Sequence, residues 1–431
     1  MSYTAFLERK AKTPTLHGPV VAASEVHPML HDWQSEIVRW AVSVGRAAIW
    51  ADTGLGKTVM QVEWARLVGG GGVALIVAPL AVCHQTIREA AKLGVEATYV
   101  RSGQGLTPGI YVTNYEMVEH FNQDELTAVV LDEASILKQS DGKTRTKLIE
   151  QFAAVPYRLA CTATPAPNDP EELTNQAEFL GHSTRVNMLA AYFIHDDIGW
   201  RLKGHATRPM MQWMSTWAVA LRKPSDLGYS DEGYDLPGLN INSHLLAVNI
   251  ETEGQLFSTD LGGVGGRAAV RKETMQARCE RAAELVLDEP DEPWLIWCGL
   301  NAEADLLAEL TGAVNVHGGL SPEQKADALL AFADGQIMRL VTKPSLAAFG
   351  LNWQHCARMV FVGLSDSYEA YYQAIRRCYR YGQTRVVEAH VVLSELEGQI
   401  ATNVARKERE SSTITAALVN EMRASRVRET A

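Results

Sequence analysis

The stretch ADTGLGKT at residues 51–58 decides the fold of the amino-terminal part of this chain. It follows the apolar run AAIW and precedes VMQVEWARLV, which has helical character. A strand, a glycine-containing turn and a helix N-terminus together make a phosphate-binding loop, because backbone N–H groups and the helix dipole then point at the anion. Gly54 and Gly56 allow that turn to wrap the phosphates. Lys57 is expected to neutralise the β- and γ-phosphates, and the Thr58 hydroxyl to ligate magnesium.

A pair of acidic residues follows further along the chain, in LDEAS at residues 131–135, at the end of the apolar run AVVL. At the tip of a parallel strand, Asp132 can hold magnesium through water while Glu133 orients and deprotonates an attacking water. Such a pair taken alone is more often a solvated loop. A phosphate-binding loop in the same domain favours the catalytic interpretation.

The stretch CTATPAPN at residues 161–168 leads from a predicted strand into small hydroxyl residues and two prolines. The hydroxyl groups of Thr162 and Thr164 can sense the γ-phosphate through hydrogen bonds, and the prolines stiffen the exit from the strand. Without its neighbours this stretch would be only a turn.

Near the other end of the chain, QAIRRCYRYGQ at residues 373–383 concentrates three arginines. At helical spacing Arg377 and Arg380 share one face and present two guanidinium groups in one direction, whereas Arg376 points about 100° away from Arg377. An anionic partner is one interpretation. The alternative is a solvated basic helix face.

Composition sets the wider bounds. The 431 residues exceed what one hydrophobic core usually organises, and 46% hydrophobic with 21% charged residues indicate a folded protein. The net charge of -11 argues against a general attraction to nucleic acid but leaves room for a local basic groove. The six cysteines form no C-x-x-C pair, and no signal peptide or apolar stretch of about 18 residues is present, so a cytosolic protein is expected.

Short apolar runs alternate with helical patterns, which is typical of α/β domains with parallel sheets. The runs fall into two groups. Between them, residues 181–240 are rich in tryptophan, methionine and polar residues and do not show this alternation. We therefore expect a first domain at 1–240, a second at 241–400 and a helical tail at 401–431. The predicted strands are VALIVA (73–78), AVVL (128–131), RLACT (158–162), WLIWC (294–298), RLVT (339–342), RMVFV (358–362) and EAHVVL (388–393).

The order of these motifs resembles that of superfamily 2 helicases. ADTGLGKT, TNYE (113–116), LDEAS, CTATPAPN and QAIRRCYRYGQ are similar to motifs I, Ic, II, III and VI of the Swi/Snf-like DNA-dependent ATPases, over about residues 27–390. The last is the most specific, because that branch typically ends motif VI in Q-A-x-x-R-x-x-R-x-G-Q. The chain looks like a minimal motor of a kind common in phages and prophages.

The resemblance implies two tandem RecA-like P-loop domains with parallel sheets and an ATP cleft between them. It implies catalytic roles for Lys57, Asp132, Glu133, Arg377 and Arg380, the two arginines acting as arginine fingers. It implies magnesium at Thr58 and Asp132. The nucleotide contacts it implies are Gln34, which is similar to the Q-motif glutamine that reads adenine, and Thr53, Gly54, Leu55, Gly56, Lys57, Thr58 and Gln373. The implied nucleic-acid contacts are Pro79, Leu80, Thr113, Asn114, His317, Gly318 and Lys343.

The function implied is a DNA-dependent ATPase that translocates on DNA, double-stranded in preference to single-stranded, with little sequence specificity. A monomer in the cytoplasm of a bacterium or phage-infected cell is expected. The alternatives are a DNA or RNA helicase that separates strands and a non-hydrolysing nucleic-acid-binding scaffold. The sequence departs from the family at Ser135, where histidine is common, and at Ala347 and Ala348, where glycines are common before the motif V residues GLN (350–352).

Overall fold

The computed structural model describes residues 18–139, 142–197, 199–247, 272–347, 352–365 and 367–429. They form two compact units. The first unit contains residues 1–232 and 409–431, and the second contains residues 233–408. This division lies a few residues before the expected boundary near 240. The segment 401–431, expected as a separate helical tail, is instead shared between the two units.

The first unit is built on a seven-stranded sheet in which all neighbouring strands run parallel. Strands such as VALIVA are buried along their whole length, as expected for β-branched runs covered by helices on both faces. A separate antiparallel hairpin pairs β7 (Phe193–Asp196) with β8 (Gly199–Leu202). In sheet order the strands are β3 (Ala97–Tyr99), β4 (Gly109–Asn114), β2 (Val73–Ala78), β5 (Ala128–Asp132), β6 (Tyr157–Cys161), β1 (Arg46–Ala51) and β9 (Ala218–Leu221).

Helices connect these strands. The α-helices of the first unit are α2 (Asp32–Val44), α3 (Lys57–Gly69), α4 (Leu80–Lys92), α5 (Lys143–Gln151), α6 (Leu173–Leu180), α7 (Arg185–Tyr192) and α8 (Thr207–Met214). Short 3-10 helices are η1 (Ala23–Glu25), η2 (Tyr115–His120), η3 (Gln123–Glu125), η4 (Ala134–Lys138), η5 (Pro170–Glu172), η6 (Gly204–Ala206) and η7 (Pro224–Leu227). Because β5, β6 and β1 are neighbours, the loops that follow them emerge side by side at one edge of the sheet.

The second unit has a six-stranded sheet, again with parallel neighbours. In sheet order its strands are β10 (Leu239–Leu246), β15 (Val387–Ser394), β14 (Arg358–Val362), β11 (Trp294–Cys298), β13 (Arg339–Thr342) and β12 (Val314–Val316). Its helices are α10 (Met275–Asp288), α11 (Asn301–Thr311), α12 (Pro322–Ala333), α13 (Pro344–Ala347), α14 (Tyr368–Ile375) and η8 (Glu395–Glu397).

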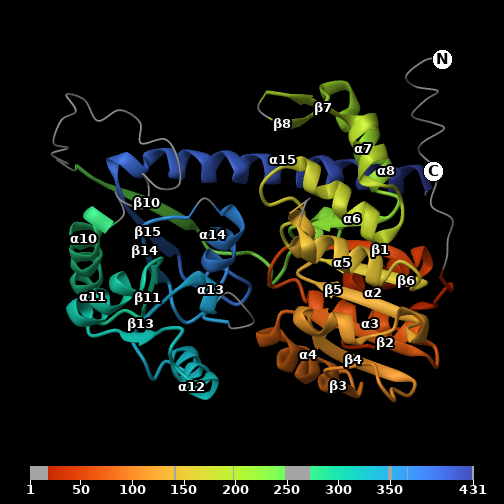
Figure 1. Ribbon diagram of the computed structural model, residues 1–431, viewed down its shortest axis with the longest axis horizontal. Coiled ribbons are helices and arrows are strands. Elements are labelled where there is room, and N and C mark those ends of the chain that lie inside the picture. Colours follow the sequence, from red (N-terminus) through yellow and green to blue (C-terminus); the bar gives the residue numbers. More distant parts are fainter. Residues whose placement is uncertain are drawn as a thin grey trace. The chain divides into compact units, whose positions relative to one another are not determined.

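Alternation along β11 divides the core of this unit into two layers. Trp294 and Ile296 pack with residues of α10 and α11 on one face, whereas Leu295 and Trp297 pack with residues of α12 and α14 on the other. Figure 1 shows α10 and α11 on one side of this sheet and α14 on the other. The expected α/β fold with two parallel sheets is therefore confirmed.

The last helix, α15 (Gly398–Glu429), belongs partly to each unit: residues 398–408 to the second and 409–429 to the first. In its later part Leu418, Val419 and Met422 are buried. Arg423 donates hydrogen bonds to the carbonyl oxygens of Asp226 and Ser225 at 2.9 and 2.7 Å. The later part of the helix is thus a packed element of the first unit rather than a free tail.

No helix of the described segments is long and apolar enough to span a membrane.

Candidate active site

The loop between β1 and α3 has the shape that the sequence predicts. Gly54 and Gly56 have positive φ values of 87° and 72°, which a side chain would resist. Gly56 is the N-cap of α3, so the helix begins at Lys57 and directs its N–H groups into the loop. The Lys57 ammonium donates to the carbonyl oxygens of Ala51 at 2.9 Å and Asp52 at 3.3 Å. The lysine therefore already lies across the loop that is expected to hold phosphate.

Gln34 packs directly on this loop. Its Nε2 donates to the carbonyl oxygen of Leu55 at 3.0 Å, and its Oε1 accepts from the backbone N–H of His31 at 3.0 Å. A Cβ built on Gly56 would lie 2.5 Å from Gln34 Nε2, so a side chain at this position would displace the Gln34 amide. Gln34 thus couples α2 to the loop, while its contact with adenine stays a prediction.

Asp132 ends β5 and its side chain is buried, with 5% exposed. Gln61 of α3 donates from Nε2 to Asp132 Oδ1 at 2.7 Å. Burial raises the pKa of the Asp132 carboxyl, and the hydrogen bond from Gln61 and the charge of Lys57 oppose that rise. Tyr115 donates to the backbone carbonyl of Asp132 at 2.5 Å. The carboxylate is therefore held from the same helix that carries Lys57.

Glu133 is the one non-glycine residue in the described ranges with a positive φ, at φ 56° and ψ 54°. Left-handed backbone at a residue other than glycine, asparagine or aspartate is uncommon and costs free energy, and such strain gathers at functional sites. The Thr162 hydroxyl, just after β6, lies 3.4 Å from Glu133 Oε2 and accepts from the Thr164 N–H at 3.1 Å. The ends of β1, β5 and β6 thus bring motifs I, II and III together.

Two polar atoms near these motifs lack partners in the part of the chain that the structure describes. They are Thr164 Oγ1 and Gln61 Oε1, both buried. A buried polar atom without a hydrogen bond is unusual and calls for an explanation such as a ligand. Ser135, where the family often has histidine, is buried and its hydroxyl lies 3.5 Å from the carbonyl oxygen of Glu133.

In the second unit the motif VI arginines do not lie on a helix, which corrects the expected helical face. Helix α14 ends at Ile375, and residues 376–380 continue in turns. The backbone N–H groups of Cys378 and Tyr379 both donate to the Ile375 carbonyl, and that of Arg380 donates to Cys378. The directions of the three arginines are therefore set by these turns and not by helical spacing.

Arg376 and Arg380 have different surroundings. The Arg376 guanidinium lies 5.3 Å from the ring centroids of both Tyr372 and Tyr379, an arrangement typical of cation–π packing. Arg380 Nε is buried without a hydrogen-bond partner within the described ranges. Burial, and then the neighbouring charge of Arg376, lower the pKa of Arg380 to about 10, so this side chain stays charged at neutral pH. A largely buried cation of this kind favours an anionic ligand.

The two glutamines of motif VI also differ. Gln373 lies in the last turns of α14 and is half-buried. Gln383 is buried: its Nε2 donates to the carbonyl oxygens of Cys356 and Cys378, and its Oε1 accepts from two backbone N–H groups. Gln383 therefore holds the turn in place.

The expected nucleic-acid residues all lie at the carboxyl ends of strands, in each unit separately. Thr113 and Asn114 end β4, but the Thr113 hydroxyl is buried and donates to the Val100 carbonyl at 2.7 Å. The side-chain oxygen of Asn114 accepts from Tyr99 at 2.7 Å. Their contact with nucleic acid stays a prediction, and these side chains would have to exchange partners to make it.

The other expected contacts are more accessible. Pro79 caps α4 and Leu80 is 55% exposed. His317 and Gly318 follow β12, where the Gly318 carbonyl accepts from Lys325 at 2.9 Å. Lys343 follows β13, and Ala347 ends α13. Ala348, Gly350 and Leu351 of the motif V region lie outside the described residues.

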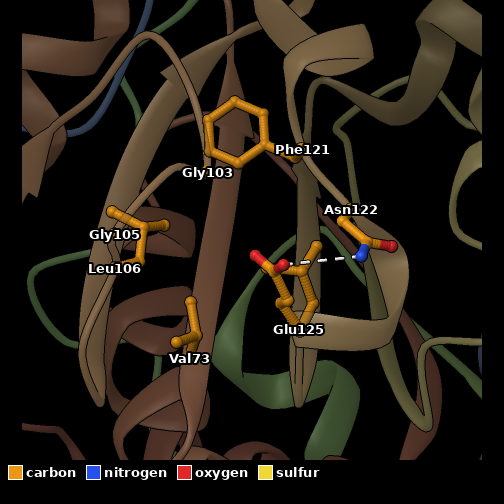
Figure 2. Close-up of a pocket in the computed structure, with 8 residues that line it drawn as sticks. Val73, Gly103, Gly105, Leu106, Phe121, Asn122 and Glu125 are labelled. Atoms are coloured by element: carbon orange, nitrogen blue, oxygen red, sulfur yellow. Dashed lines mark hydrogen bonds between the residues drawn. The ribbon is translucent and has the colours of Figure 1, made fainter.

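The pocket in Figure 2 contains none of these candidates. Its volume is about 280 Å³, and it lies at the amino ends of β2 and β5, the opposite sheet edge from the phosphate-binding loop. The figure shows Leu106 and Phe121 facing it, with Asn122 joined to Glu125. We assign the chemistry to the loop edge, because the polar groups with unusual geometry gather there.

Reading the sequence motif by motif missed Gln61 and Tyr115, which hold Asp132. Gln61 follows Lys57 by four residues on the predicted helix, so i, i+4 spacing places both on one face. The sequence therefore indicates that Gln61 and Lys57 share a helix face, but it does not indicate that Gln61 contacts Asp132. Tyr115 lies within TNYE, and nothing in its local sequence points to Asp132.

Family models agree with this geometry. The model of the SNF2-related domain matches residues 26–187, and that of the helicase conserved C-terminal domain matches residues 277–382, together more than half of the chain. The chain belongs to the SNF2-related ATPases of helicase superfamily 2. The resemblance found in the sequence is thus confirmed, and the SNF2-related ATPase is an ATP-hydrolysing, helicase-like enzyme.

Among solved structures, the SNF2-related ATPase is similar to one described as "Sulfolobus solfataricus SWI2/SNF2 ATPase core in complex with dsDNA". The two share 17% sequence identity at a TM-score of 0.45, over 94% of this chain and 98% of the other. No curated protein matches this SNF2-related ATPase.

Proposed function

We propose that this chain is a DNA-dependent ATPase that couples ATP hydrolysis to translocation on double-stranded DNA. The observation that carries the proposal is the meeting of Lys57, Asp132 and Glu133 at neighbouring strand ends, in a chain that both family models match. A non-hydrolysing scaffold would have no need of a strained glutamate beside a phosphate-binding loop.

ATP binds with its phosphates against the loop at residues 53–58 and the N-terminus of α3. Lys57 leaves the carbonyl oxygens of Ala51 and Asp52 for the β- and γ-phosphates, a short movement because these carbonyls border the loop. Gln34 gives the site its preference for adenine and keeps its hydrogen bond to the Leu55 carbonyl oxygen.

Magnesium fits the residues present. The Thr58 hydroxyl and the Asp132 carboxylate are oxygen donors, the class that Mg²⁺ prefers, and the unpartnered Gln61 Oε1 lies beside the carboxylate. No group of three His, Cys, Asp or Glu side chains that could hold a metal ion is found in the described ranges. When bound, Mg²⁺ supplies neutralisation of charge at the β- and γ-phosphate oxygens.

Hydrolysis begins at Glu133, which takes a proton from the attacking water. Glu133 has its left-handed backbone directly after β5, and the Thr162 hydroxyl of motif III lies 3.4 Å from its Oε2. The Thr164 hydroxyl, which has no hydrogen-bond partner in the described ranges, senses whether the γ-phosphate is present. Arg377 and Arg380 act as arginine fingers, whose fixed charges stabilise the transferred phosphoryl group. Their role requires that the motif VI turn reach the nucleotide during the cycle.

The proposal is tested by phosphate release with and without DNA, followed by displacement assays. We expect double-stranded DNA to stimulate release, Lys57→Ala to abolish it, and the enzyme to displace a triplex-forming strand ahead of it. Displacement of one strand of a plain duplex would instead favour a strand-separating helicase. Lack of ATP hydrolysis with any DNA would favour the scaffold.

A further inference from the structure

Gln61 joins the two halves of the nucleotide site from inside the core. It lies on α3 one turn after Lys57, and its side chain is fully buried. From there Nε2 donates to Asp132 Oδ1 at 2.7 Å. A hydrogen bond to a carboxylate is one of the stronger contacts in proteins, and it fixes the orientation of the group that accepts it. The side chain thus sets how Asp132 faces the loop.

The other end of the same amide is unsatisfied. Gln61 Oε1 is buried and has no hydrogen-bond partner in the described ranges. Burial raises the pKa of the Cys161 thiol and a hydrogen bond from Gln61 lowers it, so toward that sulfur the amide acts as a donor and not through Oε1. Leaving a buried carbonyl oxygen without a donor costs about 1 to 3 kcal/mol. A simple clamp between α3 and β5 needs only the donating half of the amide. The unsatisfied half therefore indicates a donor that arrives with a ligand.

We infer that Gln61 is a positioning residue for the metal: it orients Asp132 through Nε2, and its Oε1 accepts a hydrogen bond from a water of the Mg²⁺ hydration shell. The inference rests on the proposed function and deepens it. Mg²⁺ dehydrates reluctantly and keeps several waters, which are donors only. An amide is the side chain that can donate to a carboxylate and accept from such a water at the same time. Glutamate or lysine at this position could do only one of the two.

The competing explanation is a purely structural role, and a binding experiment separates the two. The test variant is Gln61→Met, which keeps the length and volume of an unbranched side chain but removes both hydrogen bonds. The control is Met60→Leu, a volume-conserving change at the neighbouring buried position of the same helix. Gln61→Asn serves if the methionine variant does not fold, because it retains the amide but is one methylene too short to reach Asp132.

ADP affinity is measured by isothermal titration calorimetry in EDTA and over a series of MgCl₂ concentrations. For the wild type and Met60→Leu, Mg²⁺ should tighten ADP binding. For Gln61→Met the half-effective Mg²⁺ concentration should rise about tenfold or more, the usual cost of losing such a partner. Its ADP affinity in EDTA should match that of the control.

Two results overturn the inference. The first is an unchanged Mg²⁺ midpoint in Gln61→Met or Gln61→Asn. The second is an equal loss of ADP affinity in EDTA and in MgCl₂, which would make Gln61 a structural clamp. A wild-type protein that does not bind ADP at all would instead remove the proposed function, and this inference with it.

Discussion

Two single residues near the candidate active site adopt arrangements that lower the stability of the fold. Glu133 adopts left-handed backbone that costs about 1 to 3 kcal/mol, and the buried Gln61 Oε1 has no hydrogen-bond partner among the described residues. Both lie within a few residues of Asp132 or in contact with it. Such costs in free energy persist only where the surrounding fold enforces them. We therefore expect substitutions at adjacent residues of the site to have very different effects.

Replacing Glu133 with glutamine should stop turnover without preventing binding. The amide keeps the shape of the side chain but cannot take a proton, so kcat should fall by about two to four orders of magnitude while ATP and DNA still bind. Single-turnover phosphate release and nucleotide affinity are measured, with Glu125→Gln, an exposed residue beside the distant pocket, as control. An active Glu133→Gln enzyme would mean that another group activates the water.

Gln34→Ala should reduce the preference for ATP over GTP, and it should also remove a hydrogen bond that holds the phosphate-binding loop. The wild type should hydrolyse ATP much faster than GTP, and the variant should raise the KM for ATP by an amount worth about 1 to 3 kcal/mol. Because Gln34 also bonds Leu55, part of that loss should appear equally with GTP. Steady-state kinetics with both nucleotides measure it. Equal turnover of ATP and GTP by the wild type would contradict an adenine contact.

The candidate residues lie at the ends of helices and strands. Helix α14 stops at Ile375. The turns that follow place the Arg376 guanidinium 5.3 Å from two tyrosine ring centroids, and Arg380 Nε has no hydrogen-bond partner in the part of the chain that the structure describes. Turns can direct neighbouring side chains independently, which a continuous helix cannot. The division of labour among the arginines therefore rests on their surroundings.

Arg377→Ala and Arg380→Ala should each lower kcat by about three orders of magnitude with little change in ATP affinity, because a finger acts on the transition state. Lysine at either position should restore little of the activity, since its ammonium is a point charge and does not reproduce the forked donors of the guanidinium group. Arg376→Ala is the matched control and should be mild, with a DNA-binding salt slope lower by about one at most. The three variants are compared by kcat, nucleotide Kd and salt dependence. The reverse ranking would refute the assignment.

The junction between motif III and α6 should make stability depend on pH. Burial raises the pKa of the Glu172 carboxyl to about 7, against the opposing hydrogen bonds from Asn168. A raised pKa in the folded state means that the protonated form stabilises the fold. This contribution is full below the ordinary value of 4.5 and is lost as pH rises through about 7, up to about 3 kcal/mol.

Glu172→Gln should therefore flatten the fall in stability between pH 5 and about 8, because it cannot ionise. Urea unfolding followed by tryptophan fluorescence at several pH values measures the effect. Glu150→Gln, at an exposed position of α5, is the control and should keep the wild-type slope. A Glu172→Gln variant with an unaltered slope would assign the pH dependence to another group.

For the whole molecule, the most consequential feature is that α15 supplies core to the first unit from the far end of the chain. Ending the chain after residue 408 removes Leu418, Val419 and Met422, each worth about 1.5 to 3 kcal/mol of burial. The truncated protein should show a markedly lower melting temperature for the first unit. Calorimetry tests this, with Arg208→Ala as control, since that arginine is 71% exposed and its pair with Glu421 should contribute little.

A truncated protein that melts like the full chain would mean that the later part of α15 adds nothing to the first unit. Loss of ATPase activity alone would not decide the point, because the melting temperature is the quantity that burial controls.

The order of motifs, the α/β fold and most core strands could be predicted from the sequence. Runs such as VALIVA, WLIWC, RLVT and RMVFV coincide with β2, β11, β13 and β14, and the family resemblance was carried by short motifs. These signals are local: the period of apolar residues, the need for glycine in a tight loop and the spacing of charged groups are written within a dozen residues.

Long-range contacts decided the rest. β9 is a short apolar run, AVAL, that lies within the tryptophan-rich segment, where no strand was predicted. β10 is an edge strand in which polar residues interrupt the apolar ones, so it lacks the continuous apolar run of a central strand. The bond from Gln61 to Asp132 joins positions 71 residues apart, and α15 reaches Asp226 from position 423. Which distant side chains meet depends on how the whole sheet packs, and that free energy is shared among many residues rather than encoded in any one stretch.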